Sequence, residues 1–196
     1  FSLFSFSILF NILLDMGITN FNNREISMHP QLLNKYFSNL SLLKIILGGG
    51  YFLVSLLVGY LIGYSTRQLY MLTFLLLNQL LAALILYFRS NLSGLQFFKT
   101  DSVLSVLDRV LMIVLCGFLL TSKGYKSSFR IEWFVFTQSI SYAIVALIAF
   151  LLVYRRASFF RPKFDKVFLL SIFKRSYPFA LFSLLMAFYY RIDSVM

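Results

Sequence analysis

Two charged residues lie in an otherwise apolar stretch near the end of the chain. Arg191 and Asp193 follow the pair Tyr189 and Tyr190, and the residues on both sides stay apolar. Placing a charged side chain in hydrocarbon costs at least about 2.5 kcal/mol, so such residues usually face a water-filled cavity or a partner. Arg191 could attract an anionic group, and Asp193 could anchor its helix or take part in ion coupling. The alternative is a structural pair with another helix.

Uncharged polar side chains lie within other apolar stretches. They are Asn11, Asn78, Gln79, Gln138, Ser139, Ser141 and Tyr142. Such groups could line a hydrated pathway and bind hydroxyl groups of a substrate. More often they form hydrogen bonds with neighbouring membrane helices, each worth about 0.6 kcal/mol.

The apolar surroundings of these side chains define the class of protein. Hydrophobic residues make up 60% of the 196 residues and charged residues only 13%, whereas soluble domains carry about 25% charge. This composition excludes a soluble domain, a disordered chain and a nucleic-acid-binding module, and the single Cys excludes a disulfide-rich secreted domain. The sequence therefore predicts an all-α polytopic bundle of transmembrane helices, with room for about six spans.

Charge-free stretches indicate where these spans lie. Residues 45–66, 68–88 and 133–154 contain no charged residue, and each is long enough to cross the hydrocarbon as a helix. Shorter charge-free stretches at residues 1–14, 110–122 and 176–190 predict three further spans. The span around 110–122 is expected to begin near Val103.

The basic residues are divided unequally between the two sides of this arrangement. Loops at 15–44, 89–109 and 155–175 carry thirteen Lys and Arg residues, and the opposite side carries four, at Arg67 and within 123–130. The positive-inside rule places the first group in the cytoplasm. The net charge of +11 is then a sign of topology and of contact with anionic lipids.

An amphipathic segment separates the last span from the others. Residues 164–175 alternate charged and apolar positions, with Asp165 as a helix N-cap and Lys174 and Arg175 at the helix end, which predicts an interfacial helix. Pro178 is expected to open the next span. Because the chain has no initiating Met and stops within an apolar run, we expect it to be an internal piece of a larger protein.

Three stretches together carry a family resemblance. They are residues 13–26, which contain Gly17 followed by Arg24 and Glu25, residues 98–112, and residues 176–179 with 190–193. In order, spacing and context they resemble the lipid-linked oligosaccharide flippases, the O-antigen (Wzx-type) branch of the multidrug/oligosaccharidyl-lipid/polysaccharide exporter superfamily. The resemblance covers essentially the whole chain.

The resemblance implies a twelve-helix transporter with two lobes, of which this chain is a part. Residues 1–154 would hold helices two to six of the first lobe, with helix one missing. Residues 155–177 would form a basic amphipathic cytoplasmic linker, and residues 178–196 a truncated first helix of the second lobe. The implied location is the bacterial inner membrane, and the implied role is lipopolysaccharide O-antigen export by alternating access.

The resemblance also implies partners and roles for the candidate residues. The substrate would be an oligosaccharide on an isoprenoid pyrophosphate carrier, and Arg191 would attract the pyrophosphate or an acidic sugar. Other partners would be membrane lipids and polysaccharide assembly proteins, but not nucleic acid. Residues expected to bind the substrate are Arg191, Asp193, Asn78, Gln79, Gln138 and Tyr142.

Two charged pairs at the predicted cytoplasmic ends of spans are candidates for gating. Arg24 with Glu25, and Asp108 with Arg109, could form pairs between helices that break as the lobes rock. The alternative is ordinary positive-inside charge with a local partner, which fits Asp108 and Arg109 better.

Two alternative functions remain open. An ion-coupled multidrug or organic-cation exporter of the same superfamily would need an acidic residue deep in the first lobe, whereas acids between Asp15 and Asp165 lie only at predicted span ends. A membrane-embedded polysaccharide polymerase or acyltransferase would need catalytic groups in a large outer loop, and the outer loops at 67–69 and 121–132 are short. We therefore expect no enzymatic activity.

No residue pattern indicates a metal or cofactor site. His29 stands alone in a loop, and Cys116 is the only Cys of the chain, so a zinc site has too few ligands. No phosphate-binding Gly loop or Ser/His/Asp arrangement is present. We predict neither a metal nor a cofactor.

Overall fold

The computed structural model describes the backbone of residues 2–121, 131–157 and 166–193, and these residues form helices and short connections without any strand. The helices are α1 (Ser2–Leu9), α2 (Ile12–Asp15), α3 (Ile18–Met28), η1 (Pro30–Leu32), α4 (Leu33–Leu61), α5 (Thr66–Gly94), α6 (Phe98–Thr121), α7 (Ile131–Tyr154) and α8 (Lys166–Asp193). The predicted all-α class is confirmed.

Four helical stretches are long and apolar enough to cross a membrane. They are Pro30–Leu61, Thr66–Gly94, Phe98–Leu119 and Trp133–Tyr154, which correspond to α4 with η1, α5, α6 and α7. The charge-free stretches at 45–66, 68–88 and 133–154 fall almost entirely within α4, α5 and α7. The chain is a membrane protein.

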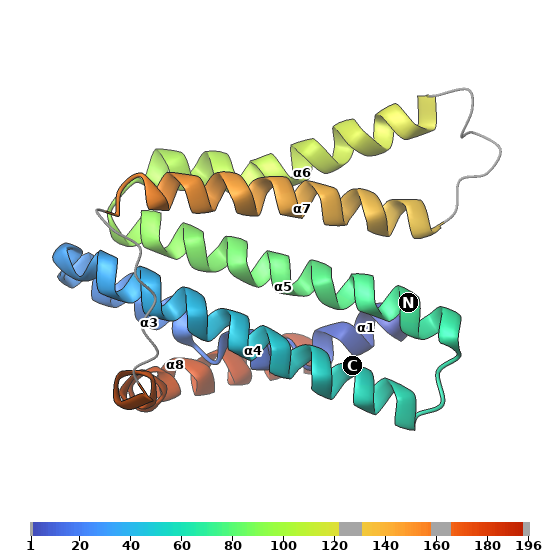
Figure 1. Ribbon diagram of the computed structural model, residues 1–196, viewed down its shortest axis with the longest axis horizontal. Coiled ribbons are helices and arrows are strands. Elements are labelled where there is room, and N and C mark those ends of the chain that lie inside the picture. The colour runs from blue at the N-terminus through green and yellow to red at the C-terminus, as the bar shows by residue number, and fades with distance from the viewer. Residues whose placement is uncertain (1, 122–130, 158–165, 194–196) are drawn as a thin grey trace.

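Helix α5 is the central element of the bundle. It packs against α7 on one side and against α3, α4 and α1 on the other, while α6 packs mainly on α7 (Figure 1). On α6, apolar side chains such as Val103, Ile113 and Phe118 are exposed, as expected of a helix that faces lipid. Helix α8 packs against α3.

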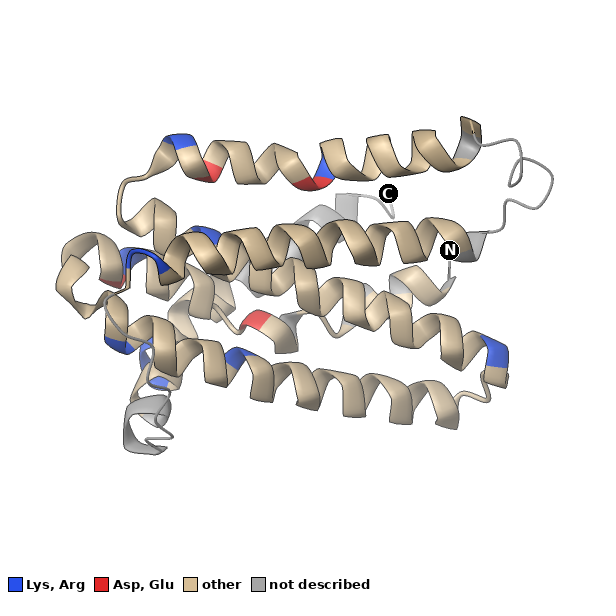
Figure 2. Cartoon of the chain, turned by 45° about the horizontal axis from the view of Figure 1, so that its top comes forward, with Lys and Arg blue, Asp and Glu red and all other residues tan. Residues whose placement is uncertain are grey.

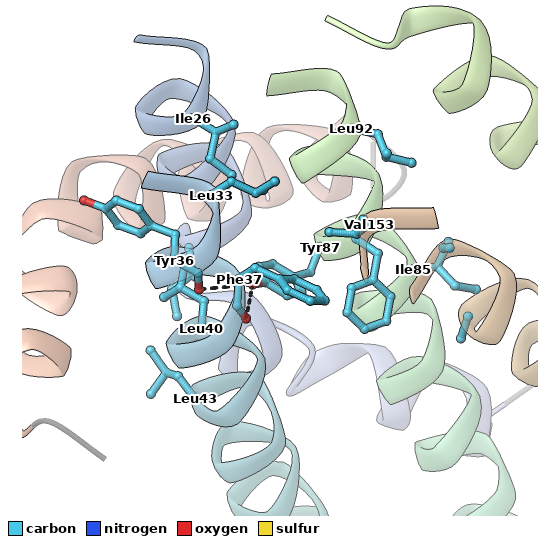
Figure 3. Packing of buried hydrophobic residues seen from close by; sticks show 14 of the residues in the cluster. Ile26, Leu33, Tyr36, Phe37, Leu40, Leu43, Ile85, Tyr87, Leu92 and Val153 are labelled. Atoms are coloured by element: carbon cyan, nitrogen blue, oxygen red, sulfur yellow. Dashed lines mark hydrogen bonds between the residues drawn. The ribbon is translucent and has the colours of Figure 1, made fainter. Parts of the chain in front are cut away.

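An aromatic cluster joins α4, α5 and α7 near one end of the bundle. The rings of Phe37, Phe88 and Phe150 lie with their centroids 5.6–6.2 Å apart. The buried Tyr87 hydroxyl donates to the carbonyls of Tyr36, at 3.4 Å, and Phe37, at 3.1 Å (Figure 3). Aromatic pairs of this kind are worth about 0.5–1.5 kcal/mol each, and they help to hold the three helices in register.

Most described Lys and Arg residues gather at the same end, which we call the basic end (Figure 2). It comprises Arg24, Lys35, Arg89, Lys99, Arg155, Arg156, Lys174 and Arg175, whereas Arg67 lies at the opposite end. The distribution agrees with the division expected from the sequence, and the assignment of the basic end to the cytoplasm stays a prediction.

Two stretches expected to be loops at the basic end are largely helical instead. Residues 15–44 form α3, η1 and the first third of α4, and residues 89–109 form the end of α5 and the start of α6. In the second stretch, Arg89 Nε lies 2.6 Å from Asp101 Oδ1. The expectation of a loop was therefore wrong for residues 15–44, where helices accommodate the charges. In the second stretch, α6 begins at Phe98, a few residues before the span start predicted near Val103.

Helix α8 also differs from expectation. The sequence predicts an interfacial helix followed by a span that opens at Pro178, whereas α8 is continuous from Lys166 to Asp193 with Pro178 inside it. A proline within a helix removes one backbone hydrogen bond and crowds the preceding turn. Asp165, expected as the N-cap, lies outside the described residues.

Candidate functional site

The first segment of the chain is a helix broken between α2 and α3. Met16 and Gly17 both have positive φ, at 45° and 76°, and Gly17 is the N-cap of α3. A Cβ atom on Gly17 would lie 2.4 Å from the backbone nitrogen of Ala180 and 2.8 Å from the carbonyl oxygen of Ser176. Glycine is therefore required here both for its conformation and for the close approach of α8.

Asp15 lies directly before this break and caps α3. Its Oδ1 atom accepts hydrogen bonds from the Thr19 backbone N–H, at 3.3 Å, and from the Thr19 hydroxyl. The carboxylate thus satisfies part of the unpaired N–H groups of α3 and lies at the positive end of its dipole.

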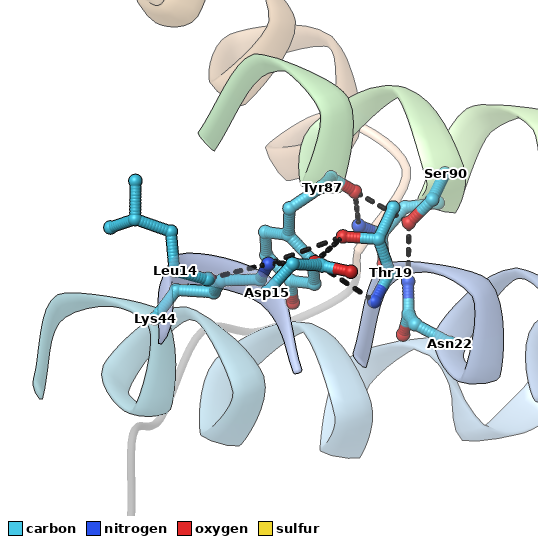
Figure 4. Close-up of polar contacts among 8 residues, drawn as sticks. Leu14, Asp15, Thr19, Asn22, Lys44, Tyr87 and Ser90 are labelled. Atoms are coloured by element: carbon cyan, nitrogen blue, oxygen red, sulfur yellow. Dashed lines mark hydrogen bonds and ion pairs between the residues drawn. The ribbon is translucent and has the colours of Figure 1, made fainter. Parts of the chain in front are cut away.

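Lys44 of α4 completes this arrangement. Its Nζ atom forms an ion pair with Asp15 Oδ1 and donates to the Leu14 carbonyl, at 3.1 Å, and to Thr19 Oγ1, at 3.2 Å (Figure 4). The Lys44 side chain is 1% exposed and that of Asp15 is 33% exposed. Three acceptors for one ammonium group are what a buried cation requires. We call Asp15, Thr19 and Lys44 the ionic break.

Residue counts along the packed helices give the distance of the ionic break from the end of the apolar stretch. The Phe37 ring of α4 contacts Phe150 of α7, with ring centroids 5.8 Å apart, and Phe150 lies about one helical turn from the end of the charge-free stretch at Tyr154. Lys44 lies about two turns, or roughly 10 Å, further along α4. Counted along the helices, Lys44 is therefore about 16 Å from the basic end of that stretch, which is about half of the roughly 30 Å that a hydrocarbon layer measures.

A pocket of about 300 Å³ lies beside the ionic break. Its polar lining comprises Asn11, Asp15, Thr19, Asn20 and Gln79. One side of α5 supplies the remaining lining, Ala82, Ala83 and Leu86. Because the alanine side chains are short, they leave room between α5 and the broken segment. The pocket therefore brings amide, hydroxyl and carboxylate groups together next to an apolar wall, as small-molecule sites usually do.

Among the residues expected to bind substrate, Gln79 lines this pocket, whereas Asn78 faces α7. Asn78 Nδ2 donates to the Val135 carbonyl at 3.3 Å and to Gln138 Oε1 at 3.4 Å, and Asn78 Oδ1 accepts from Ser139 Oγ at 2.6 Å. Gln138 Nε2 donates to the Tyr142 hydroxyl at 3.2 Å. These bonds match the helix-packing alternative considered for such residues, and substrate binding by Asn78, Gln138 and Tyr142 stays a prediction.

The candidate gating residues lie apart from the pocket. Glu25 accepts a hydrogen bond from the Tyr36 hydroxyl at 3.4 Å, which links α3 to α4, and Arg24 is exposed. On α6, Arg109 Nε lies 3.7 Å from the neighbouring Asp108, and the Arg109 side chain is 67% exposed. The second pair is thus local, and a gating role for either pair stays a prediction.

Arg191 and Asp193 lie in the last turn of α8, but their side chains fall outside what the structure describes. Their expected roles in substrate binding stay predictions.

Sequence analysis missed the ionic break, because it treated each charge as the end of a span. One signal was available. Residues 36–43 before Lys44 contain no charge and several large apolar residues, so the apolar stretch continues on both sides of this lysine. Asp15 is likewise followed by Met16, Gly17 and Ile18 before the next charge at Arg24.

The chain matches a known protein family. A family model described as polysaccharide biosynthesis protein matches residues 2–196. The chain belongs to this polysaccharide biosynthesis family. The matched residues include the broken segment, the ionic break and α8. Neither the curated proteins nor the solved structures that were compared show a match to the chain.

Proposed function

We propose that the chain is part of a transporter that moves a lipid-linked oligosaccharide across the bacterial inner membrane by alternating access. The polysaccharide biosynthesis family supports a role in making or moving a polysaccharide. The observation that favours transport is the pocket beside the ionic break, because it opens polar groups near the middle of helices that are long enough to span the membrane.

The physical problem of such transport is to move a polar head through hydrocarbon. Broken membrane helices often line such pathways, since they present unpaired backbone groups and polar side chains at mid-depth. The break between α2 and α3 has this form. The isoprenoid tail of the substrate would stay in lipid while the oligosaccharide passes the pocket, with no covalent chemistry. The proposed activity is therefore transport, not catalysis, and O-antigen units are the proposed cargo.

Asp15 also bears on the alternative of an ion-coupled exporter. The exporter is disfavoured if the acids lie only at predicted span ends, and this reason is weaker for Asp15, because Asp15 pairs with Lys44, which lies inside the candidate span Pro30–Leu61. Its charge is nevertheless already paired with Lys44. An organic cation would have to compete with a fixed ammonium group, so the oligosaccharide transporter remains the better proposal.

Reconstitution of the complete protein tests the proposal. Proteoliposomes would be loaded with a fluorescent isoprenoid-diphosphate oligosaccharide, and its appearance in the outer leaflet would be followed by an impermeant quencher. We expect movement above that of protein-free vesicles, and no uptake of a fluorescent organic cation. Uptake of the cation alone would replace the proposal with the exporter.

The variant Arg191→Ala adds a test of the predicted substrate-binding residue. We expect lower transport with a normal level of protein in the membrane. Undiminished transport would remove Arg191 from the mechanism and leave the proposed function standing.

A further inference from the structure

The charge balance of the pocket beside the ionic break restricts what it can bind. Lys44 is 1% exposed and lies behind Asp15, whereas Asp15 keeps a third of its side chain exposed and lines the pocket. Oδ1 of Asp15 is occupied by Lys44 and Thr19. A ligand therefore meets a carboxylate group whose charge is neutralised from the far side, and it cannot contact the ammonium directly.

This arrangement disfavours both classes of charged ligand. A diphosphate would meet the carboxylate and not the cation, and like charges at close range repel in a region of low dielectric constant. An organic cation would gain little from a carboxylate that is already paired. The other polar lining groups, Asn11, Asn20, Gln79 and Thr19, carry no charge.

The uncharged lining has the chemistry that hydroxyl groups require. Each of the three amide side chains offers both donors and an acceptor, and a carboxylate oxygen accepts hydroxyl protons strongly. Ala82 and Ala83 lie one turn along α5 from Gln79, on the same face of the helix, and form a shallow apolar wall beside it. Hydroxyl groups of a ring can therefore be satisfied by the amides and the carboxylate while its C–H groups contact the alanines.

We propose that this pocket binds a neutral sugar ring of the transported molecule and does not bind its diphosphate. The inference rests on the proposed function and adds to it an assignment of one part of the substrate to one set of residues. Gln79 on α5 and Asn11 on the broken segment would contact the ring from two different elements. The diphosphate is then bound elsewhere.

Binding to two lipids that differ only in the sugar tests this assignment. The complete protein in nanodiscs would be titrated with an isoprenoid diphosphate that carries a neutral trisaccharide, and with the same isoprenoid diphosphate without sugar. Gln79→Leu and Asn11→Leu remove the amide groups from either element at similar volume. The matched control is Thr73→Val, because Thr73 is an exposed residue of α5 whose hydroxyl bonds to the Leu69 carbonyl of the same helix.

We expect both leucine variants to bind the sugar-bearing lipid about tenfold more weakly, and to bind the sugar-free lipid as the wild type does. Thr73→Val should bind both lipids normally. The two leucine variants lie on different elements. If one of them misfolds, which its size-exclusion profile would show, the other still tests the assignment.

Three results would overturn the assignment. If the variants bind the sugar-bearing lipid normally, the pocket is not a sugar site, although the proposed function stands. If the variants bind both lipids more weakly to the same extent, the pocket binds the diphosphate or has only a structural role. If the wild type shows no preference for the sugar-bearing lipid and does not transport it, the proposed function fails as well, which distinguishes this failure from the other two.

Discussion

The ionic break and the α5–α7 contact both place polar groups among apolar helices, but they do so in different ways. Between α5 and α7 the helices are regular, and neutral side chains of Asn78, Gln138 and Ser139 bond across or along the contact. At the ionic break, the helix is interrupted, two full charges meet, and a pocket opens beside them. Regular helices with neutral bonds are suited to holding two elements together. An interrupted helix with charges and space is suited to a site.

The largest effect should come from removing the cation of the ionic break. Lys44→Met leaves Asp15 without its counter-charge among apolar helices, and we expect a loss of about 3–5 kcal/mol in stability, as for other broken buried pairs. Thermal unfolding of the detergent-solubilised protein would measure it. Combining Lys44→Met with Asp15→Asn removes both charges and should restore most of the loss. An equal loss of stability in the single and double variants would show that the unpaired charge of Asp15 does not cause the loss.

The next effect concerns the backbone at the break. Gly17→Ala forces a positive φ on alanine and a clash with the backbone of α8 at 2.4 Å, so we expect a loss of about 1–3 kcal/mol in the same unfolding assay. Gly49→Ala is the matched control, because nothing lies within 4 Å of a Cβ at that position of α4. It should be neutral or up to about 1 kcal/mol stabilising. Similar losses at both glycines would contradict the close approach.

A smaller effect is expected at the α5–α7 contact. Asn78→Leu removes the bonds to α7, each worth about 0.6 kcal/mol in a membrane protein, so the total loss should be about 1–2 kcal/mol. If the contact is structural, transport per folded molecule should stay unchanged. A fall in transport at a normal protein level would instead support the predicted role of Asn78 in substrate binding.

The smallest effect should come from the exposed pair on α6. Arg109→Gln breaks a local contact at 3.7 Å in a side chain that is 67% exposed, so stability should change by less than about 0.5 kcal/mol. Transport measured in proteoliposomes then separates the two interpretations of this pair. A changed transport rate supports gating, and an unchanged one leaves Arg109 as surface charge.

The regular helices could be predicted from the sequence, and the ionic break could not. Hydrophobicity located α4, α5 and α7 because a bilayer requires long charge-free helices, and a stretch such as residues 133–154 leaves few other solutions. It also singled out Gln79, which lines the pocket. The ion pair between Asp15 and Lys44 was not predicted, because each residue was interpreted as the end of a span. Their pairing depends on how the broken segment folds back along α4, and no local pattern encodes that.

The prediction that a new helix begins at Pro178 was wrong for a related reason. Proline usually marks the start of a helix, but α8 continues through it. Here α8 approaches Gly17 closely on both sides of Pro178, at Ser176 and Ala180, and such a tertiary contact is not part of the local preference of proline. The sequence also gave no sign that Gly17 meets the backbone of α8, since the two segments lie far apart along the chain.

The meeting of Gly17 with α8 has a mechanical consequence. No side chain separates the two backbones there, so nothing between them can compress or rotate to absorb displacement. If α8 slides or tilts, the peptide units next to Asp15 must shift with it, and the carboxylate must reorient relative to the lysine. Any rearrangement of α8 therefore acts on the backbone two residues from the acid, without an intervening relay.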